Sequence, residues 1–239
     1  MKNNKSFWAI IPAAGVGKRM SADKPKQYLE LQNKTVIEHC LQRLLDHPAV
    51  EGVVVSLDDN DNYWKTVNFT HEKPVLVTVG GAERYDSVIN SLMTLKNHLP
   101  VDGLNDVWVL VHDAARPCIR QEDISKLIET ASFDDHGGLL AVPVRDTMKR
   151  QQENHRVQTT VDRTGLWHAL TPQMFKLPLL INALNNAQEK GLHVTDDASA
   201  MELGGYMPLL VEGHEDNIKI TRPFDLTLAN LYLKEQLND

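Results

Sequence analysis

Short apolar runs rich in β-branched residues alternate along the chain with segments in which apolar residues recur every three or four positions. This alternation is typical of βα units, in which parallel strands form a sheet covered by helices on both faces. It predicts an α/β fold with a mostly parallel sheet. The predicted strands are Phe7–Ile11, Val53–Leu57, Val75–Val79, Val107–His112, Leu139–Val142, Leu209–Val211 and Ile218–Ile220.

Helix signals occupy the intervals between these runs. Thr35 and Glu38 have the spacing of a capping box, which opens a helix that continues to about Leu45 and stops before Pro48. Glycines follow two of the later segments, as is common at the carboxyl ends of helices. The other predicted helices are Ser87–Asn97, Glu122–Ser132, Pro178–Lys190, Asp197–Leu203 and Pro223–Gln236.

The segment between Asp146 and Asp162 departs from this rhythm. Thr147–Arg150 and Arg156–Val161 are separated by a polar turn, which predicts a two-stranded hairpin with little apolar surface to bury. A lone hairpin is marginally stable, so we expect this arm to pack on another surface, most simply a second subunit. The 239 residues therefore predict one domain, 1–239, with an inserted dimerisation arm at about 144–165.

Composition narrows the classes of function. With 25 Lys and Arg against 32 Asp and Glu, the net charge is −7, whereas a protein that binds a nucleic-acid backbone needs a basic face. No run approaches the roughly 18 apolar residues that span a membrane, and the first residues lack the pattern of a signal peptide. We therefore expect a cytoplasmic protein whose partners include neither nucleic acid nor membrane.

Two cysteines, Cys40 and Cys118, are too few for a metal cluster or a disulfide framework, and we expect both to be small buried side chains. The chain also contains no HExxH pattern and no GxSxG pattern. Zinc-dependent hydrolysis and serine-hydrolase chemistry of those types are therefore disfavoured.

A small-residue loop, Pro12–Met20, follows the first predicted strand. It does not fit a phosphate-binding P-loop, because Pro12 and Arg19 occupy required positions, nor the dinucleotide fingerprint, which has glycine where Met20 stands. Its glycines still allow main-chain N–H groups to approach anionic oxygens. The cations that follow indicate a triphosphate site, although a tight turn with a solvated basic face is the alternative: Lys18, Arg19, Lys24 and Lys26.

Two further strand ends carry candidate chemistry. Asp113 follows a buried strand and is placed where Mg²⁺ is often held by one or two carboxylates together with substrate phosphates. Alternatively, Asp113 closes the turn and pairs with Arg116. Gly80 and Gly81 end another strand, and Ser87 begins the following helix; glycines there let the main chain approach a flat base.

These segments resemble a known family. The matching blocks are Pro12–Met20 with Lys24–Tyr28, Gly80–Val88, Val111–Pro117, Val142–Lys149, Asp162–Trp167, Thr171–Gln173 and Asn217–Thr221. Together they closely resemble the signature of the 2-C-methyl-D-erythritol 4-phosphate cytidylyltransferases of the non-mevalonate isoprenoid pathway. The resemblance spans nearly the whole chain and implies a Rossmann-like sheet of the nucleotide-diphospho-sugar transferase type.

The resemblance implies a nucleotidyltransferase that moves CMP from CTP to 2-C-methyl-D-erythritol 4-phosphate. The products are 4-diphosphocytidyl-2-C-methyl-D-erythritol and pyrophosphate. Two alternatives remain open: a cytidylyltransferase for another polyol phosphate such as ribitol 5-phosphate, and a non-catalytic nucleotide-binding protein of the same fold. The blocks at Arg145–Lys149 and Asp162–Trp167 favour the first assignment, and the presence of all the candidate charged residues disfavours the last.

The resemblance also implies roles for individual residues. Asp113 positions Mg²⁺ on CTP, and the arm carries acceptor-binding residues across a homodimer. Where many family members have an acidic residue, this chain has Ala82, so a side-chain contact is lost there while main-chain recognition of the base is kept. The implied catalytic residues are Arg19, Lys26 and Lys219; those for the nucleotide are Ala13, Ala14, Gly15, Gly17, Gly81, Ser87 and Ala114; those for the acceptor are Arg116, Thr147, Arg163, Thr171 and Thr195.

Overall fold

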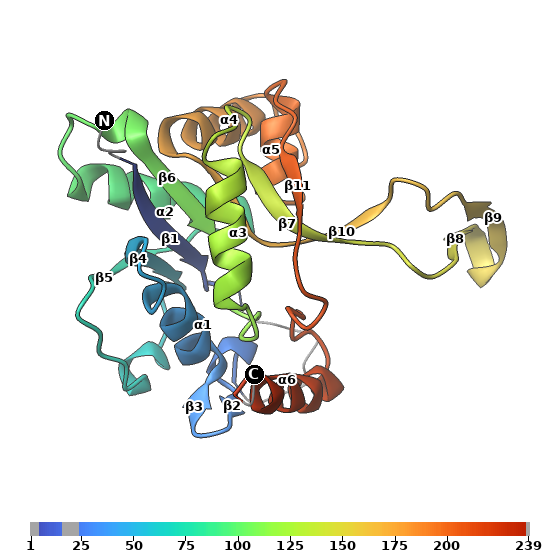
Figure 1. Ribbon diagram of the computed structural model, residues 1–239, viewed down its shortest axis with the longest axis horizontal. Coiled ribbons are helices and arrows are strands. Elements are labelled where there is room, and N and C mark those ends of the chain that lie inside the picture. Colours follow the sequence, from blue (N-terminus) through green and yellow to red (C-terminus); the bar gives the residue numbers. More distant parts are fainter. Residues whose placement is uncertain (1–4, 16–23, 238–239) are drawn as a thin grey trace.

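A computed structural model describes residues 5–15 and 24–237. Its centre is a sheet of seven strands in the order β11-β7-β10-β6-β1-β4-β5, shown in Figure 1. The strands are β1 (Ser6–Pro12), β4 (Val50–Leu57), β5 (Val75–Val79), β6 (Val107–Val111), β7 (Gly138–Pro143), β10 (Trp167–Lys176) and β11 (Leu209–Glu212).

All neighbouring strands pair in parallel except β10, which is antiparallel to both β6 and β7. The predicted fold class, a mostly parallel α/β sheet, is confirmed. Helices cover both faces: α1 (Val36–Leu45) and α3 (Gln121–Ala131) pack on one, and α2 (Arg84–His98), α4 (Leu177–Glu189) and α5 (Asp197–Leu203) on the other.

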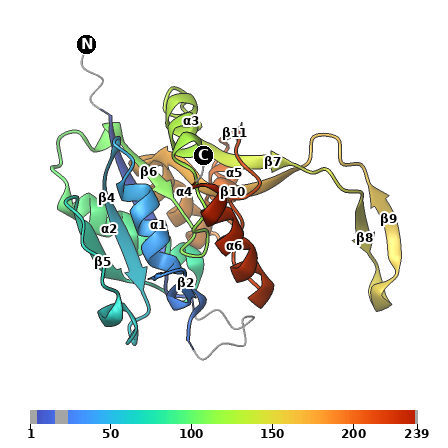
Figure 2. The ribbon, with the colours of Figure 1, turned by 60° about the horizontal axis from the view of Figure 1, so that its bottom comes forward.

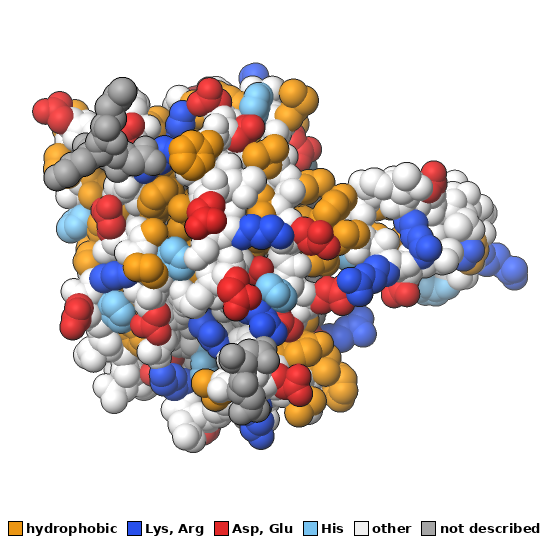
Figure 3. Space-filling model, viewed as in Figure 1, with side chains coloured by type: hydrophobic (Ala, Val, Ile, Leu, Met, Phe, Trp, Pro, Cys, Tyr) orange, Lys and Arg blue, Asp and Glu red, His pale blue; other side chains and the backbone are white. Residues whose placement is uncertain are grey.

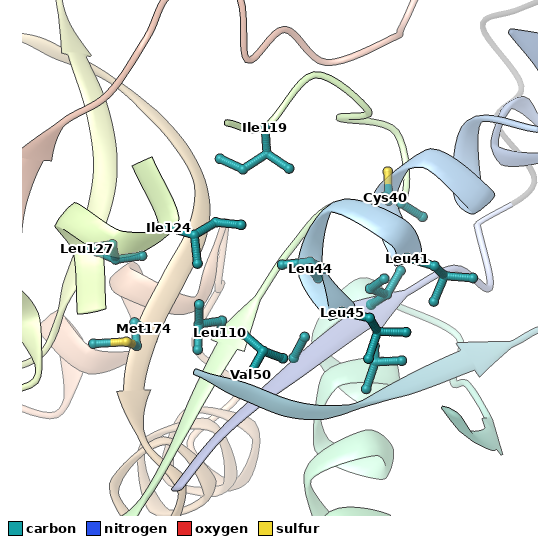
Figure 4. Close-up of a cluster of buried hydrophobic side chains, with 14 of the residues drawn as sticks. Cys40, Leu41, Leu44, Leu45, Val50, Leu110, Ile119, Ile124, Leu127 and Met174 are labelled. Carbon is teal, nitrogen blue, oxygen red and sulfur yellow. The ribbon is translucent and has the colours of Figure 1, made fainter. Parts of the chain in front are cut away.

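The alternation of side chains along β1 explains this layering. Phe7, Ala9 and Ile11 belong to the cluster under α1 and α3, whereas Trp8 and Ile10 belong to the cluster under α2, α4 and α5. Successive residues of a strand point to opposite faces, so a strand that is buried on both sides is apolar throughout. Figure 4 shows the first cluster, in which side chains of α1 and α3 converge over the sheet.

The predicted capping box is present at the start of α1. The Thr35 hydroxyl accepts a hydrogen bond from the Glu38 N–H at 3.4 Å, and the Glu38 carboxylate accepts one from the Thr35 N–H at 2.6 Å. Cys40 and Cys118 are free and buried, as predicted. The other predicted helices also form, with boundaries within three residues of those expected.

One predicted strand does not form, and one strand of the central sheet was not predicted. Ile218–Ile220 does not form a strand, because the Ile218 N–H is used in a turn to Asp216 and only the Ile220 N–H reaches a neighbouring segment, at Ala115 O. Conversely, β10 was not predicted. It contains Pro172, which lacks an N–H, and its pairing with β7 is interrupted between Ala169 and Gln173.

A third apolar cluster lies beside the sheet. Helix α6 (Pro223–Glu235) packs Ala229 and Leu233 against Leu31, which ends the short strand β2 (Glu30–Leu31), and against Ala115 after β6. Strand β2 pairs with β3 (Lys34–Thr35). Ile220 belongs to the same cluster and is completely buried. This packing holds the segment before α6 against the carboxyl end of β6.

The arm extends from the body between β7 and β10, as Figures 1 and 2 show. It contains β8 (Met148–Gln151) and β9 (Val157–Val161), which pair antiparallel. Nearly all of its side chains are exposed within the chain. The remaining short elements are the 3₁₀ turns η2 (Lys26–Tyr28), η3 (Trp64–Thr66), η4 (Leu104–Asp106) and η5 (Glu153–His155).

The strand order locates a ligand site before any side chain is considered. β1 lies between β4 on one side and β6 on the other, so the connections leave it in opposite directions. Open α/β sheets bind ligands outside the carboxyl ends of the strands at such a switch point. None of the helices in the described part of the chain is long and apolar enough to cross a membrane.

Candidate active site

A cavity of about 380 Å³ lies at the switch point. Its walls come from the segments that follow β1, β5 and β6, together with η2 and the loop before α6. It therefore gathers residues that are far apart in the sequence. The lining residues are Pro12, Ala13, Ala14, Gly15, Lys26, Gln27, Gly81, Ala82, Glu83, Arg84, Ser87, Asp113, Ala114, Ala115 and Lys219.

Gln27 holds the described part of the glycine loop. Its side chain is 3% exposed, and its Nε2 donates to Ala13 O at 2.7 Å and to Gly15 O at 3.2 Å. An amide nitrogen has two hydrogens, so both are used and the two loop carbonyls are satisfied. Gly15 lines the cavity, and a Cβ on it would meet no atom of the described residues within 4 Å.

Asp113 is the centre of the charged part of the cavity. Its side chain is 10% exposed and touches three cations: Arg84 Nε lies 3.4 Å from Oδ1, and Arg116 Nε and Lys219 Nζ lie 3.2 Å and 2.9 Å from Oδ2. Both sequence interpretations of Asp113 are therefore compatible with the structure, since it pairs with Arg116 and also lines the cavity.

Burial and the neighbouring positive charges shift the pKa of Asp113 in opposite directions. Burial alone would raise its pKa, but Arg84, Lys219 and Arg116 outweigh that effect and lower the pKa far below its usual range. Burial lowers the pKa of Arg116, although Asp113 partly offsets this. The carboxylate thus stays ionised throughout the pH range in which proteins function.

The two predicted catalytic lysines meet at this cluster. Lys219 pairs with Asp113, and Lys26 Nζ donates a hydrogen bond to Ile220 O at 3.0 Å across 194 positions of sequence. Because Ile220 is anchored in the third apolar cluster, this bond holds the lysine on η2 beside the segment that carries Lys219, and both lysines line the cavity.

The turn after β5 is equally compact. A Cβ on Gly81 would lie 2.2 Å from the Cβ of Asp86, so only glycine fits. The Ser87 hydroxyl accepts from the Gly81 N–H at 3.0 Å and donates to Glu83 O at 3.3 Å. Ser87 carries the only hydroxyl among the described lining residues, and these bonds make it a support for the turn.

His112 and Thr171 form a buried relay behind Asp113. His112 Nε2 must donate to Arg116 O at 2.9 Å, so Nδ1 is the acceptor and the Thr171 hydroxyl donates to it at 3.0 Å. The same hydroxyl accepts from the Asp113 N–H at 3.1 Å. Thr171, predicted to bind the acceptor, is 4% exposed and is not among the residues that line the cavity.

The other predicted acceptor residues lie apart from one another. Arg116 is buried behind Asp113, and its Nη1 donates to Asn217 O at 2.7 Å. Thr195 is exposed and lines a second cavity, of about 540 Å³, while Asp196 caps α5 by accepting from the Ser199 N–H. Thr147 and Arg163 are exposed on the arm. Gly17 and Arg19 lie outside the described residues, as does Lys18.

Three side chains that order the site were given no individual role from the sequence. Gln27 and Arg84 lie inside blocks that carry the family resemblance, and Arg84 is also one of the cations that the sequence places in or beside the candidate site. Asp197 belongs to the segment Thr195–Asp197, which resembles a family block near the substrate; it opens α5, is completely buried and pairs with Arg84 at 2.9 Å. The sequence therefore marked the segments of these residues, but not the contacts that define their roles.

The described lining of the cavity contains three cations, Lys26, Arg84 and Lys219, and its one hydroxyl, that of Ser87, supports the turn after β5. Such a lining suits the transfer of a phosphoryl-type group. A phosphate attacker is already anionic near pH 7, so the protein has to neutralise charge and align the reactants. The fold and the site together place the chain among the nucleotidyltransferases.

Comparison with known proteins defines the family. Residues 7–235 match the family of 2-C-methyl-D-erythritol 4-phosphate cytidylyltransferases, and the chain belongs to it. Proteins of that name from Vibrio vulnificus YJ016 and Aliivibrio fischeri ES114 are 48% and 51% identical to it. The alignments cover 97% and 96% of this chain and 96% and 94% of those proteins.

A solved structure shares the fold. The crystal structure of a 4-diphosphocytidyl-2C-methyl-D-erythritol synthase superposes with a TM-score of 0.82 at 38% sequence identity, covering 96% of this chain and 99% of that one. The arrangement of sheet and helices described above is therefore that of an experimentally determined relative.

The hydrogen bonds of Gln27 lead to a first prediction. Gln27→Glu, assayed at pH 8, places a carboxylate against the two loop carbonyls. We expect destabilisation by about 1–3 kcal/mol and a rise of roughly tenfold in the KM for the nucleotide, because the loop is displaced. Gln42→Glu, on half-buried helix surface outside the cavity, is the control. An unchanged KM in Gln27→Glu would show that the loop does not depend on this side chain.

The buried His112 predicts a pH dependence of stability. Burial lowers its pKa from 6.5 to about 4, against the opposing effects of the Arg116 carbonyl and Asp113. Below pH 6.5 His112 is protonated in the unfolded chain but stays neutral in the folded chain. The free energy of unfolding therefore falls as the pH drops towards 4. The loss from this group is about 2 kcal/mol between pH 7 and pH 5.

His112→Gln keeps a donor for Arg116 O and removes this titration. Denaturant unfolding at pH 7 and pH 5 should show a smaller loss of stability in the variant than in the wild type, whereas His168→Gln, at an exposed position, should retain the wild-type loss. Equal losses in all three proteins would contradict the assignment to His112.

Proposed function

We propose that the chain transfers the cytidylyl group of CTP to 2-C-methyl-D-erythritol 4-phosphate. A phosphate oxygen of the acceptor forms a bond to the α-phosphorus of CTP, and the bond from that phosphorus to the bridging oxygen of pyrophosphate breaks. The products are pyrophosphate and 4-diphosphocytidyl-2-C-methyl-D-erythritol. The observation that carries the proposal is the convergence of Lys26, Lys219 and Asp113 in one cavity at the switch point.

Lys26 and Lys219 would stabilise the charge that builds up on the α-phosphate in the transition state. Each comes from a different segment of the chain, and each is placed by contacts with buried parts of the fold. In the proposal Arg19 adds charge on the triphosphate. Such cations act without reorganisation because the fold has already aligned them.

The donor set near Asp113 fits a hard cation held mainly by substrate. The described residues contain no group of three or more His, Cys, Asp or Glu side chains that could enclose a metal ion. Mg²⁺ usually keeps few protein ligands and takes the rest from phosphates and water. Asp113 would hold the ion, which would supply positive charge to the phosphate oxygens, and Lys219 would act from its place beside the same carboxylate on the cavity wall.

The nucleoside would lie against the turn after β5 and the start of the glycine loop. Gly81, Ala82 and Ala14 expose main chain and small side chains to the cavity, which suits a flat base and its donor and acceptor edge. Ala82 contributes no polar side chain, so recognition of cytosine would depend on main-chain groups, with Ser87 fixing the turn that presents them.

The acceptor-binding site would be completed by residues of a second subunit. Thr147 and Arg163 are exposed on an arm that has no core of its own, and Figure 3 shows Lys and Arg side chains over its surface. Arg163 donates a hydrogen bond to Arg145 O, which orients it at the base of the arm. In the proposed homodimer its guanidinium would bind the acceptor phosphate of the neighbouring site, with Arg116, Thr171 and Thr195 on the receiving side.

The proposed location is the cytoplasm, which agrees with two buried, unbridged thiols. Pyrophosphate release tests the function. Purified protein with Mg²⁺ is given each of the four common nucleoside triphosphates with methylerythritol phosphate, ribitol 5-phosphate or glycerol phosphate. We expect release with CTP and methylerythritol phosphate. Turnover with ribitol 5-phosphate in its place, or no turnover with any acceptor, would reject the assignment.

Removal of either lysine should slow the chemical step. Lys26→Ala and Lys219→Ala are each expected to lower kcat by roughly 10² to 10³, the usual cost of deleting one group that stabilises transition-state charge. Lys96→Ala, an exposed lysine of α2, is the control and should retain wild-type kcat. Near-wild-type turnover in either lysine variant would remove that residue from the mechanism.

The shared site predicts complementation between two inactive variants. If Arg163 serves the neighbouring subunit, a mixed dimer of Lys26→Ala and Arg163→Ala contains one intact site. Random mixing makes half of the dimers mixed, so about one quarter of wild-type turnover should return. A mixture of Lys26→Ala and Lys219→Ala should stay inactive, because both lysines act in the same chain. Recovery in neither mixture would place Arg163 outside the partner's site.

A further inference from the structure

Asp197 is a buried carboxylate that the mechanism above does not use. It is the first residue of α5 and is 0% exposed. Its Oδ2 accepts a hydrogen bond from Arg84 Nη2 at 2.9 Å, while Oδ1 is buried and has no hydrogen-bond partner among the described residues. An ionised group in this position is costly unless an opposite charge is held firmly beside it.

Arg84 connects this carboxylate to the reaction site. Its Nε lies 3.4 Å from Asp113 Oδ1, so one guanidinium spans two carboxylates. Arg84 also forms part of the wall of both cavities, the one with the catalytic lysines and the one that contains Thr195. It is 30% exposed, so a bound triphosphate has access to it.

The planar shape of the guanidinium means that the bond to Asp197 also sets the direction in which the rest of the Arg84 head group points. Its nitrogens form a rigid plane, so fixing Nη2 on Asp197 also fixes where Nε points. The contact with Asp197 is the shorter of the two. Without the bond to Asp197, Asp113 and the phosphate oxygens in the cavity would compete for the Arg84 guanidinium. The more strongly charged triphosphate would then draw the guanidinium away from Asp113.

We propose that Asp197 is a positioning residue that holds Arg84 on Asp113 and away from the triphosphate. The inference rests on the proposed function, because Asp113 is the residue that must stay in place during cytidylyl transfer. A misplacement on the order of 1 Å in such a group can lower a rate by about 10². Release of Arg84 onto the triphosphate would strengthen ground-state binding without helping the reaction.

Asp197→Asn separates this role from a role in folding alone. The variant keeps the shape of the side chain and removes its charge. We expect kcat to fall at least about tenfold while the Kd for CTP, measured calorimetrically without acceptor, falls about threefold or more. Asp123→Asn is the matched control: it is 1% exposed on α3 and accepts from His214, outside both cavities. It should change the melting temperature but neither kcat nor Kd.

A double-mutant cycle tests whether Asp197 acts through Arg84. In an Arg84→Gln background, Asp197→Asn should change kcat and the Kd for CTP by less than about twofold. The proposal is overturned if Asp197→Asn leaves kcat unchanged, if its effects are equally large in both backgrounds, or if CTP binding weakens in step with the melting temperature. Because CTP binding needs no acceptor, the cycle gives an answer even if turnover with methylerythritol phosphate fails.

Discussion

The structure depends on one electrostatic constraint: the Asp113 carboxylate is buried at the carboxyl end of β6 and must be balanced. Three cations do this, and each comes from a different part of the chain: Arg84 from the start of α2, Arg116 from the turn after β6, and Lys219 from the segment before α6. Because the site keeps more cations than carboxylates, it is ready for an anionic substrate before one arrives. The acidic total of the chain, −7, has no bearing on this local excess.

Non-polar packing makes this balance possible. Lys219 precedes Ile220, which is fixed in the cluster beneath α6, and Gln27 is fixed under the glycine loop. Polar groups behind Asp113 are satisfied in a set order: His112 donates to a carbonyl, Thr171 donates to His112, and the Asp113 N–H donates to Thr171. The charged side chains are therefore supported by buried side chains, and the hydrogen bonds of the polar ones restrict their rotation.

Much of this arrangement could be predicted from sequence, since apolar runs and helix caps are local patterns. The carboxyl ends of parallel strands must meet, which is why the segments after β1, β5 and β6 were expected to share a site. Strand β10 could not be predicted, because Pro172 interrupts it and its partners are remote in sequence. Ile218–Ile220 looked like a strand because its apolar residues serve a side-chain cluster rather than a sheet.

Buried polar roles are the part that local patterns do not encode. Asp197 and Gln27 look like a helix-start acid and an ordinary surface amide, and their importance appears only when Arg84 and the loop carbonyls are brought to them. Thr171 shows a related case. Its motif predicts contact with the acceptor, and only the structure shows that its hydroxyl also links the Asp113 N–H to His112.

The bond from Lys26 to Ile220 closes a loop of 194 positions, and this has a consequence for the order of events during synthesis. The chain leaves the ribosome with its amino end first, so the glycine loop is synthesised early. Lys219 and the apolar cluster around Ile220 follow only when almost all of the sheet has been synthesised. Nucleotide binding can therefore stabilise early folding intermediates only weakly. Tight binding of a triphosphate requires a chain in which these distant segments have already come together.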